Sequence, residues 1–83
     1  MLNFIDTVEH YNKSLKTIKT NFDNNIISKE TAQEKTNDLI KELEEILYAY
    51  DFIYPYNWIK KLEKVLDNCK DFVSSLNAVE NTL

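Results

Sequence analysis

The chain has 83 residues, a hydrophobic content of 43% and a net charge of −4. This length supports one hydrophobic core, so we expect a single domain over residues 1–83. Glycine is absent and there is one proline, which excludes the glycine-dependent hairpins of β proteins and favours helices. All ten basic residues are lysines, and the negative net charge argues against direct nucleic-acid binding.

The first predicted element is a helix over about residues 3–23. Its apolar residues follow alternating four- and three-residue steps, which keep them on one helical face: Phe4, Val8, Tyr11, Leu15, Ile18 and Phe22. The helix should end in the segment Asp23–Asn25, because aspartate and asparagine tolerate a left-handed backbone and replace the missing terminal glycine.

The second predicted helix covers about residues 29–50. Ser28 is the expected N-cap, and Thr31 followed by Glu34 offers an alternative capping box one turn later. The apolar face again has four-three steps: Ala32, Thr36, Leu39, Leu43, Ile46 and Tyr50. Because this face starts with small side chains and ends with large ones, we expect the densest packing near the C-terminal end of the helix.

The third predicted helix covers about residues 56–80, after a turn that Pro55 imposes by disfavouring helical geometry at Tyr54. Its apolar face is the most regular of the three: Trp58, Leu62, Val65, Cys69, Phe72, Leu76, Val79 and Leu83. Short connections force neighbouring helices to run antiparallel. The predicted fold is therefore all-α, an antiparallel three-helix bundle with coiled-coil-like packing faces.

The charges predict which helices are neighbours. Acidic residues collect near the C-terminus of the second helix and lysines near the N-terminus of the third, where each set opposes its own helix dipole: Glu42, Glu44, Glu45, Lys60, Lys61 and Lys64. Side by side, the two sets would offset one another, which favours pairing of these helices.

The sequence lacks the residue groupings that catalytic sites and metal sites usually require. His10 has no second histidine or cysteine at ligand spacing, and Cys69 falls on a buried helical face with no basic neighbour to activate it. The segment Asp23–Asn25 followed by Glu30 resembles the start of a calcium loop, but the central glycine is missing. We therefore predict no enzyme, no cofactor and no metal site.

The cellular compartment is also predicted from features that the sequence lacks. One cysteine cannot form an internal disulfide, which fits a reducing compartment. No basic-then-apolar N-terminal stretch and no run of about 18–20 apolar residues occurs, so we expect neither a secretion signal nor a membrane span. The chain is predicted to be cytoplasmic.

The segment 48–58 carries six aromatic side chains in eleven residues, more than one turn at the end of a thin bundle readily buries. Tyrosine and tryptophan anchor protein interfaces, so a partner-binding tip is one interpretation and a hydrophobic plug over the bundle end is the other. Insertion into a membrane interface is a weaker alternative, because the neighbouring acidic residues would be repelled by anionic lipids. The candidate partner-binding residues are Tyr50, Phe52, Tyr54, Tyr56 and Trp58.

A second candidate surface is an acidic row on the predicted second helix. Its members follow three- to four-residue steps: Glu30, Glu34, Asp38, Glu42 and Glu45. Such a row is commonly a solvated face, and it is also the kind of surface that meets the basic groove of a nucleic-acid-handling enzyme.

These patterns favour a non-enzymatic protein–protein interaction module. In size, helicity and acidic balance the chain resembles small phage or mobile-element proteins that inhibit a host or bacterial defence protein, and also bacteriocin immunity proteins, which are helical bundles. The first resemblance implies an inhibitor or adaptor. Two alternatives remain: a homodimeric structural protein, and a nucleic-acid-associated regulator using lysines grouped as Lys13, Lys16, Lys19 and Lys60, Lys61, Lys64.

Overall fold

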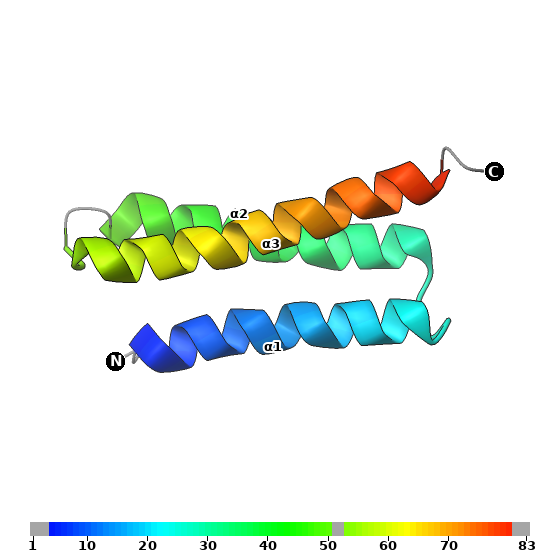
Figure 1. The fold of residues 1–83 in the computed structure, drawn as a ribbon, viewed down its shortest axis with the longest axis horizontal. Helices are drawn as coiled ribbons and strands as arrows, with labels where there is room; N and C mark the ends of the chain where they lie inside the picture. The colour runs from blue at the N-terminus through cyan, green and yellow to red at the C-terminus, as the bar shows by residue number, and fades with distance from the viewer. Residues whose placement is uncertain (1–3, 51–52, 81–83) are drawn as a thin grey trace.

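The computed structural model describes the backbone of residues 4–50 and 53–80 and the side chains of residues 4–50 and 53–78. It contains three helices: α1 (Phe4–Asp23), α2 (Lys29–Tyr50) and α3 (Tyr56–Glu80). In Figure 1, α1 and α3 run in the same direction and α2 runs against both. The predicted all-α, antiparallel three-helix bundle is confirmed, and the helix bounds lie within one residue of those expected.

The turn after α1 is closed by a left-handed residue, as the sequence predicted. Asn25 has φ = 60°. The amide of Ile26 donates to the carbonyl of Asn21 at 2.8 Å and that of Asn25 donates to the carbonyl of Phe22 at 3.1 Å. This pair of bonds is the Schellman arrangement, which satisfies carbonyls that the end of a helix leaves without partners.

The starts of α2 and α3 have different caps. The hydroxyl oxygen of Ser28 accepts a hydrogen bond from the amide of Thr31 at 3.1 Å, so Ser28 is the N-cap and the alternative capping box is not used. At α3, the carbonyl of Pro55 accepts from the amides of Trp58 and Ile59 at 3.0 and 3.2 Å. Pro55 therefore opens α3, whereas α2 has already ended at Tyr50.

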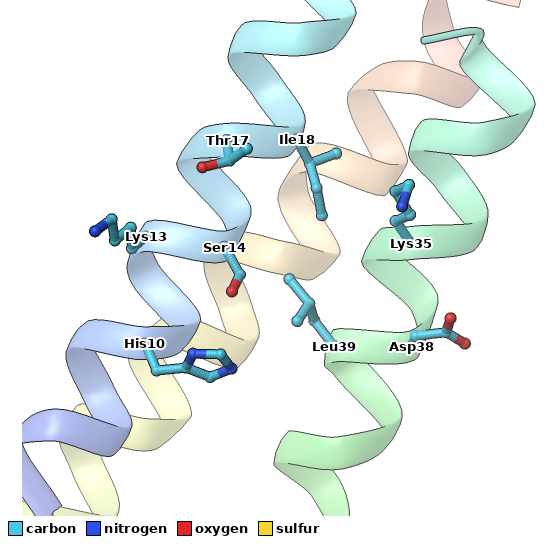
Figure 2. Close-up of a pocket in the computed structure, with 8 residues that line it drawn as sticks. All are labelled: His10, Lys13, Ser14, Thr17, Ile18, Lys35, Asp38 and Leu39. Carbon is cyan, nitrogen blue, oxygen red and sulfur yellow. The ribbon is translucent and has the colours of Figure 1, made fainter.

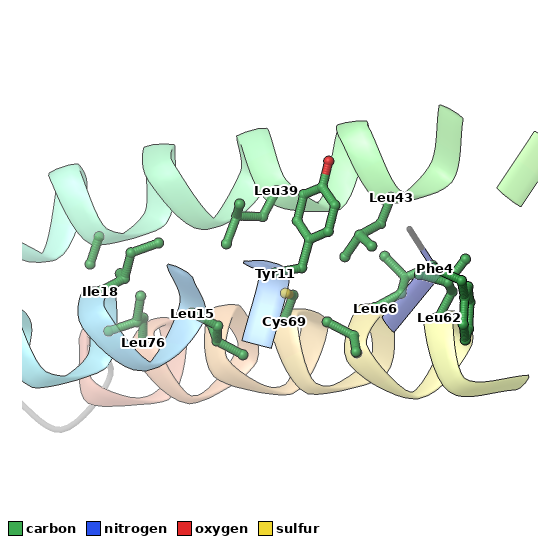
Figure 3. Close-up of a cluster of buried hydrophobic side chains, with 12 residues drawn as sticks. Phe4, Tyr11, Leu15, Ile18, Leu39, Leu43, Leu62, Leu66, Cys69 and Leu76 are labelled. Carbon is green, nitrogen blue, oxygen red and sulfur yellow. The ribbon is translucent and has the colours of Figure 1, made fainter. Parts of the chain in front are cut away.

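The core runs along the whole bundle, and α2 packs more extensively against α3 than α1 packs against either. Figure 3 shows the buried side chains of the three helices lying in a row along the length of the bundle, between the helices. The buried set comprises Phe4, Tyr11, Leu15, Ile18, Ala32, Thr36, Leu39, Leu43, Ile59, Leu62, Val65, Leu66, Cys69 and Leu76.

The expected concentration of packing at the C-terminal end of α2 is wrong. Ala32, Thr36 and Leu43 are fully buried, whereas Ile46 and Leu47 further along are only half-buried. Ile46 and Leu47 lie in the last turns of α2, where fewer neighbouring side chains are available to cover them. The Thr36 hydroxyl donates to the carbonyl of Ala32 at 2.7 Å, so this buried polar group is satisfied.

Two polar contacts tie α2 to α3. The Gln33 side-chain amide donates to the side-chain oxygen of Asn77. Lys70 lies 3.8 Å from Glu44, with both side chains more than half exposed. The predicted charge pairing of these helices thus has the right helices and one of the right acidic residues, but the lysine lies further along α3 than expected. An exposed pair of this kind contributes about 0–1 kcal/mol, so it sets register more than stability.

The bundle measures 45 × 21 × 16 Å. The start of α1, the end of α2 and the start of α3 share one end (Figure 1), so the aromatic residues of these three segments come together there. Among the described helices, none combines the length and apolar character needed to cross a lipid bilayer.

Candidate partner-binding site

Four aromatic rings close the end of the bundle where α1 and α3 begin. Phe4 stacks on Trp58 with ring centroids 4.5 Å apart and planes 10° from parallel. Tyr54 meets the edge of Phe4 at 6.0 Å and lies 5.5 Å from Trp58, and Tyr50 stacks on Tyr54 at 5.0 Å. Such ring pairs contribute about 0.5–1.5 kcal/mol each beyond the area they bury. Part of the aromatic segment is therefore a structural cap.

Other apolar side chains at the same end face solvent. The exposed fractions are 90% for Tyr48, 68% for Ile53 and 73% for Tyr56, and Tyr50 is 37% exposed on the outer side of the ring stack. We call these four residues the tip surface. Exposed large apolar side chains mark an interaction site where they form a contiguous patch.

The five aromatic residues predicted as partner anchors divide between cap and surface. Tyr54 and Trp58 are half-buried in the ring stack, Tyr50 lies at its edge, and Tyr56 is exposed. Phe52 lies outside the described residues. Rings spaced four residues apart, those of Tyr50, Tyr54 and Trp58, thus take part in the ring stack, while Ile53 and Tyr56 are exposed and partner binding by this segment stays a prediction.

Tyr56 has a charged neighbour on α3. The ammonium of Lys60, one turn along α3, lies 5.3 Å from the centroid of the Tyr56 ring. A hydrogen bond with the Tyr56 side chain raises the pKa of Lys60, with a smaller contribution from Glu63. Tyr56 is thereby flanked by a cation on one side of the tip surface.

The predicted acidic row is exposed along its whole length, from Glu30 and Glu34 through Asp38 and Glu42 to Glu45. It lies close enough to α1 to act on Tyr11, whose pKa is raised first by burial and then by the charges of Glu42 and Glu45. The row therefore borders the seam between α1 and α2, and is not confined to the side of α2 opposite the core.

A groove of about 450 Å³ lies on this seam. Ile18 and Leu39 form its floor, and polar side chains of both helices line its sides: His10, Lys13, Ser14, Thr17, Lys35 and Asp38. We call it the α1–α2 groove. Histidine, serine and aspartate together suggest a hydrolytic relay, but Figure 2 shows the Asp38 carboxylate directed away from the His10 ring. The arrangement lacks the base–orienter contact that such a relay needs.

The remaining candidate nucleophile is enclosed in the core. Cys69 is fully buried, and burial raises the pKa of its thiol, partly offset by the charge of Lys19. A thiol of this kind is a weak nucleophile at neutral pH. Within the part of the chain that the structure describes, no cluster of histidine, cysteine, aspartate and glutamate is placed to hold a metal ion.

Two features of this end of the bundle were not predicted from the sequence. Phe4 belongs to the aromatic cap although it is fifty residues from the rings it meets, and Ile53 is exposed although it sits within an apolar run. The α-helical spacing of Tyr50, Tyr54 and Trp58 was the available signal for the cap.

No protein-family model, no curated protein and no solved structure matches this chain.

Proposed function

We propose that this chain is a non-enzymatic interaction protein that binds another protein through the tip surface of Tyr48, Tyr50, Ile53 and Tyr56. The observation that carries the proposal is the exposure of these side chains on a rigid base, since Ile53 and Tyr56 are each more than two-thirds exposed above the Phe4–Trp58 ring stack. Of the anchors named from the sequence, Tyr54 and Trp58 now serve as that base.

The composition of the tip supports an interface. Tyrosine offers a large, rigid contact area and loses little conformational entropy when a partner covers it. The ring stack beneath the tip connects all three helices, so the surface is preorganised and little ordering has to accompany binding.

The acidic row supports a partner with a basic surface, such as a nucleic-acid-handling enzyme. Glu42 and Glu45 are the members nearest the tip, and their charges reach as far as Tyr11 on α1. Exposed charges of one sign accelerate association with a partner of opposite sign and weaken with added salt. In the proposed complex, contacts of the tip surface supply the binding affinity. The charges of the acidic row accelerate association with the partner.

The biological setting we propose is that of an inhibitor or adaptor acting in the cytoplasm, encoded by a phage or mobile element and directed at a host or bacterial defence protein. It is supported by the small size, the acidic balance and the single, buried cysteine. A bacteriocin-immunity role is the alternative that shares the same helical architecture.

A capture experiment with matched variants tests the proposal. The chain is immobilised and exposed to bacterial lysate in three forms: wild type, Ile53→Ser combined with Tyr56→Ser, and Ile26→Ser. Ile26 is the control because it is 67% exposed, against 68% for Ile53, but lies in the turn at the opposite end of the bundle. We expect a protein that wild type and the Ile26 variant retain and the tip variant loses. Equal retention by all three forms would contradict the proposal.

A further inference from the structure

A second groove lies between α1 and α3, on the other side of α1 from the α1–α2 groove. It has a volume of about 200 Å³ and is lined by Val8 and Asn12 of α1 and by Lys61, Lys64, Val65 and Asn68 of α3. We call it the α1–α3 groove. The spacing explains its composition: Lys61, Lys64 and Asn68 follow three- and four-residue steps along one edge of α3, and Val8 and Asn12 are one turn apart on α1.

The lining combines an apolar floor with polar sides. Val65 is 2% exposed and Val8 is half-buried, so the floor is apolar. The polar groups around it are two lysine ammoniums, which only donate hydrogen bonds, and two asparagine side-chain amides, whose NH2 groups donate and whose oxygens accept. No carboxylate lines this groove, although the chain has fourteen aspartates and glutamates in total. The α1–α2 groove differs, because Asp38 accompanies its lysines.

We propose that the α1–α3 groove binds the phosphate group of a small phosphate monoester. A phosphate dianion matches two lysine point charges, and the asparagine amides can donate to its remaining oxygens.

The size of the groove limits the rest of the ligand. At about 30 Å³ per water molecule, 200 Å³ corresponds to the space of roughly seven waters. That space holds a phosphate and a few attached carbon atoms, which would rest on Val8 and Val65. A small metabolite fits this description better than a nucleic-acid strand.

Occupancy of the groove has a structural consequence. The ligand would bridge α1 to α3, and α1 is the helix with the least extensive contacts in the bundle. Because the groove exists only when α1 and α3 are packed together, binding should raise the midpoint of thermal unfolding, and the midpoint should keep rising with the logarithm of ligand concentration above the dissociation constant.

The test is titration of the ¹⁵N-labelled full chain with phenyl phosphate, at an ionic strength kept constant with sodium chloride, followed by amide chemical shifts. We expect saturable shifts at Val8, Asn12, Val65 and Asn68, together with a raised unfolding midpoint. The double substitution of Lys61→Gln and Lys64→Gln should weaken binding about tenfold or more, since each lysine supplies a charged hydrogen bond. Asn68→Asp, which places a carboxylate in the groove at unchanged size, should abolish it.

Matched controls make the outcome decisive. Lys35→Gln combined with Lys41→Gln removes the same charge from α2 and should leave the affinity unchanged. An equal loss in this variant would mean general electrostatic attraction or binding in the α1–α2 groove, and would overturn the proposal. Benzoate tests the phosphate specifically: affinity equal to that of phenyl phosphate would overturn the assignment of a phosphate monoester. Shifts that grow linearly without saturation would also overturn it.

Discussion

Phe4, at the start of α1, and Trp58, at the start of α3, stack with ring centroids 4.5 Å apart and planes 10° from parallel. This contact fastens the helix with the least extensive packing to the rest of the bundle. It also forms the base on which the tip surface rests. The stability of the bundle end and the shape of the proposed interface thus depend on the same two rings.

Removing this stack should destabilise the fold. Phe4→Ala is expected to lower the free energy of unfolding by about 3 kcal/mol, because it deletes a buried aromatic ring. The chain has one tryptophan, so the emission of Trp58 reports on the same contact and should shift to longer wavelength as the ring becomes more hydrated. Urea unfolding followed by fluorescence measures both effects.

The control for this substitution is Ile26→Ala. Ile26 is exposed, so its removal should change the free energy of unfolding by no more than about 0.5 kcal/mol. A Phe4→Ala variant with wild-type stability and unchanged emission would show that the stack does not hold α1 in place.

The helix boundaries could be predicted because they depend on neighbouring residues. Ser28 caps α2 through a bond to the amide three residues on, and Asn25 ends α1 in a left-handed turn. Pro55 separates α2 from α3 for equally local reasons. Four-three spacing of apolar residues then identified most of the buried side chains, since helical periodicity alone decides which residues share a face.

The sites could be predicted only in part, because they depend on which helices are neighbours and how closely they pack. Lys61 and Lys64 were recognised as a local charge cluster, but their meeting with Asn12 required knowing that α1 covers that side of α3. In the same way, the ring stack of this segment on Phe4 could not be predicted, because no spacing within the segment 48–58 reveals the position of Phe4.

Substitutions of Asn25 should separate backbone from side-chain effects at the α1–α2 turn. Its positive φ costs a residue with a β-carbon about 1–2 kcal/mol, which asparagine partly avoids by local hydrogen bonding. We expect Asn25→Ala to destabilise the fold by about 1 kcal/mol and Asn25→Gly to leave it unchanged or slightly stabilised. Thermal unfolding followed by circular dichroism measures the difference. A more stable alanine than glycine variant would be inconsistent with the left-handed turn.

The raised pKa of Tyr11 leads us to expect a loss of stability at alkaline pH. Burial, and then the charges of Glu42 and Glu45, raise its pKa in the folded state above the unfolded value of about 10. The folded state therefore holds the phenolic proton more tightly, so this contribution to stability is complete below pH 10 and is lost as pH rises through the folded pKa.

Urea unfolding at pH 8 and pH 11 checks this expectation. Wild type should lose more of its free energy of unfolding over this interval than Tyr11→Phe, which has no proton to release. An identical loss in the two proteins would mean that the environment of Tyr11 does not favour the protonated form. Comparison of the two proteins cancels the titration of the lysines and of the other tyrosines.

Cys69 should react slowly with thiol reagents. Its side chain is fully buried and its pKa is raised by that burial, so both access and thiolate formation are suppressed in the folded chain. We expect labelling by a disulfide reagent at pH 8 to be many-fold slower in native buffer than in urea. Labelling as fast as in the unfolded chain would instead indicate an accessible, activated thiol and would reopen a catalytic interpretation.

The central claim is that the tip surface is uncovered in the isolated chain and is therefore open to another protein. The most direct measurement is the mass in solution by light scattering, for wild type, for Ile53→Ser combined with Tyr56→Ser, and for Ile26→Ser. We expect the mass of one chain for all three proteins. A wild-type dimer that persists in the Ile26 variant and splits in the tip variant would show that the tip binds a second copy of this chain, and would contradict the proposed function.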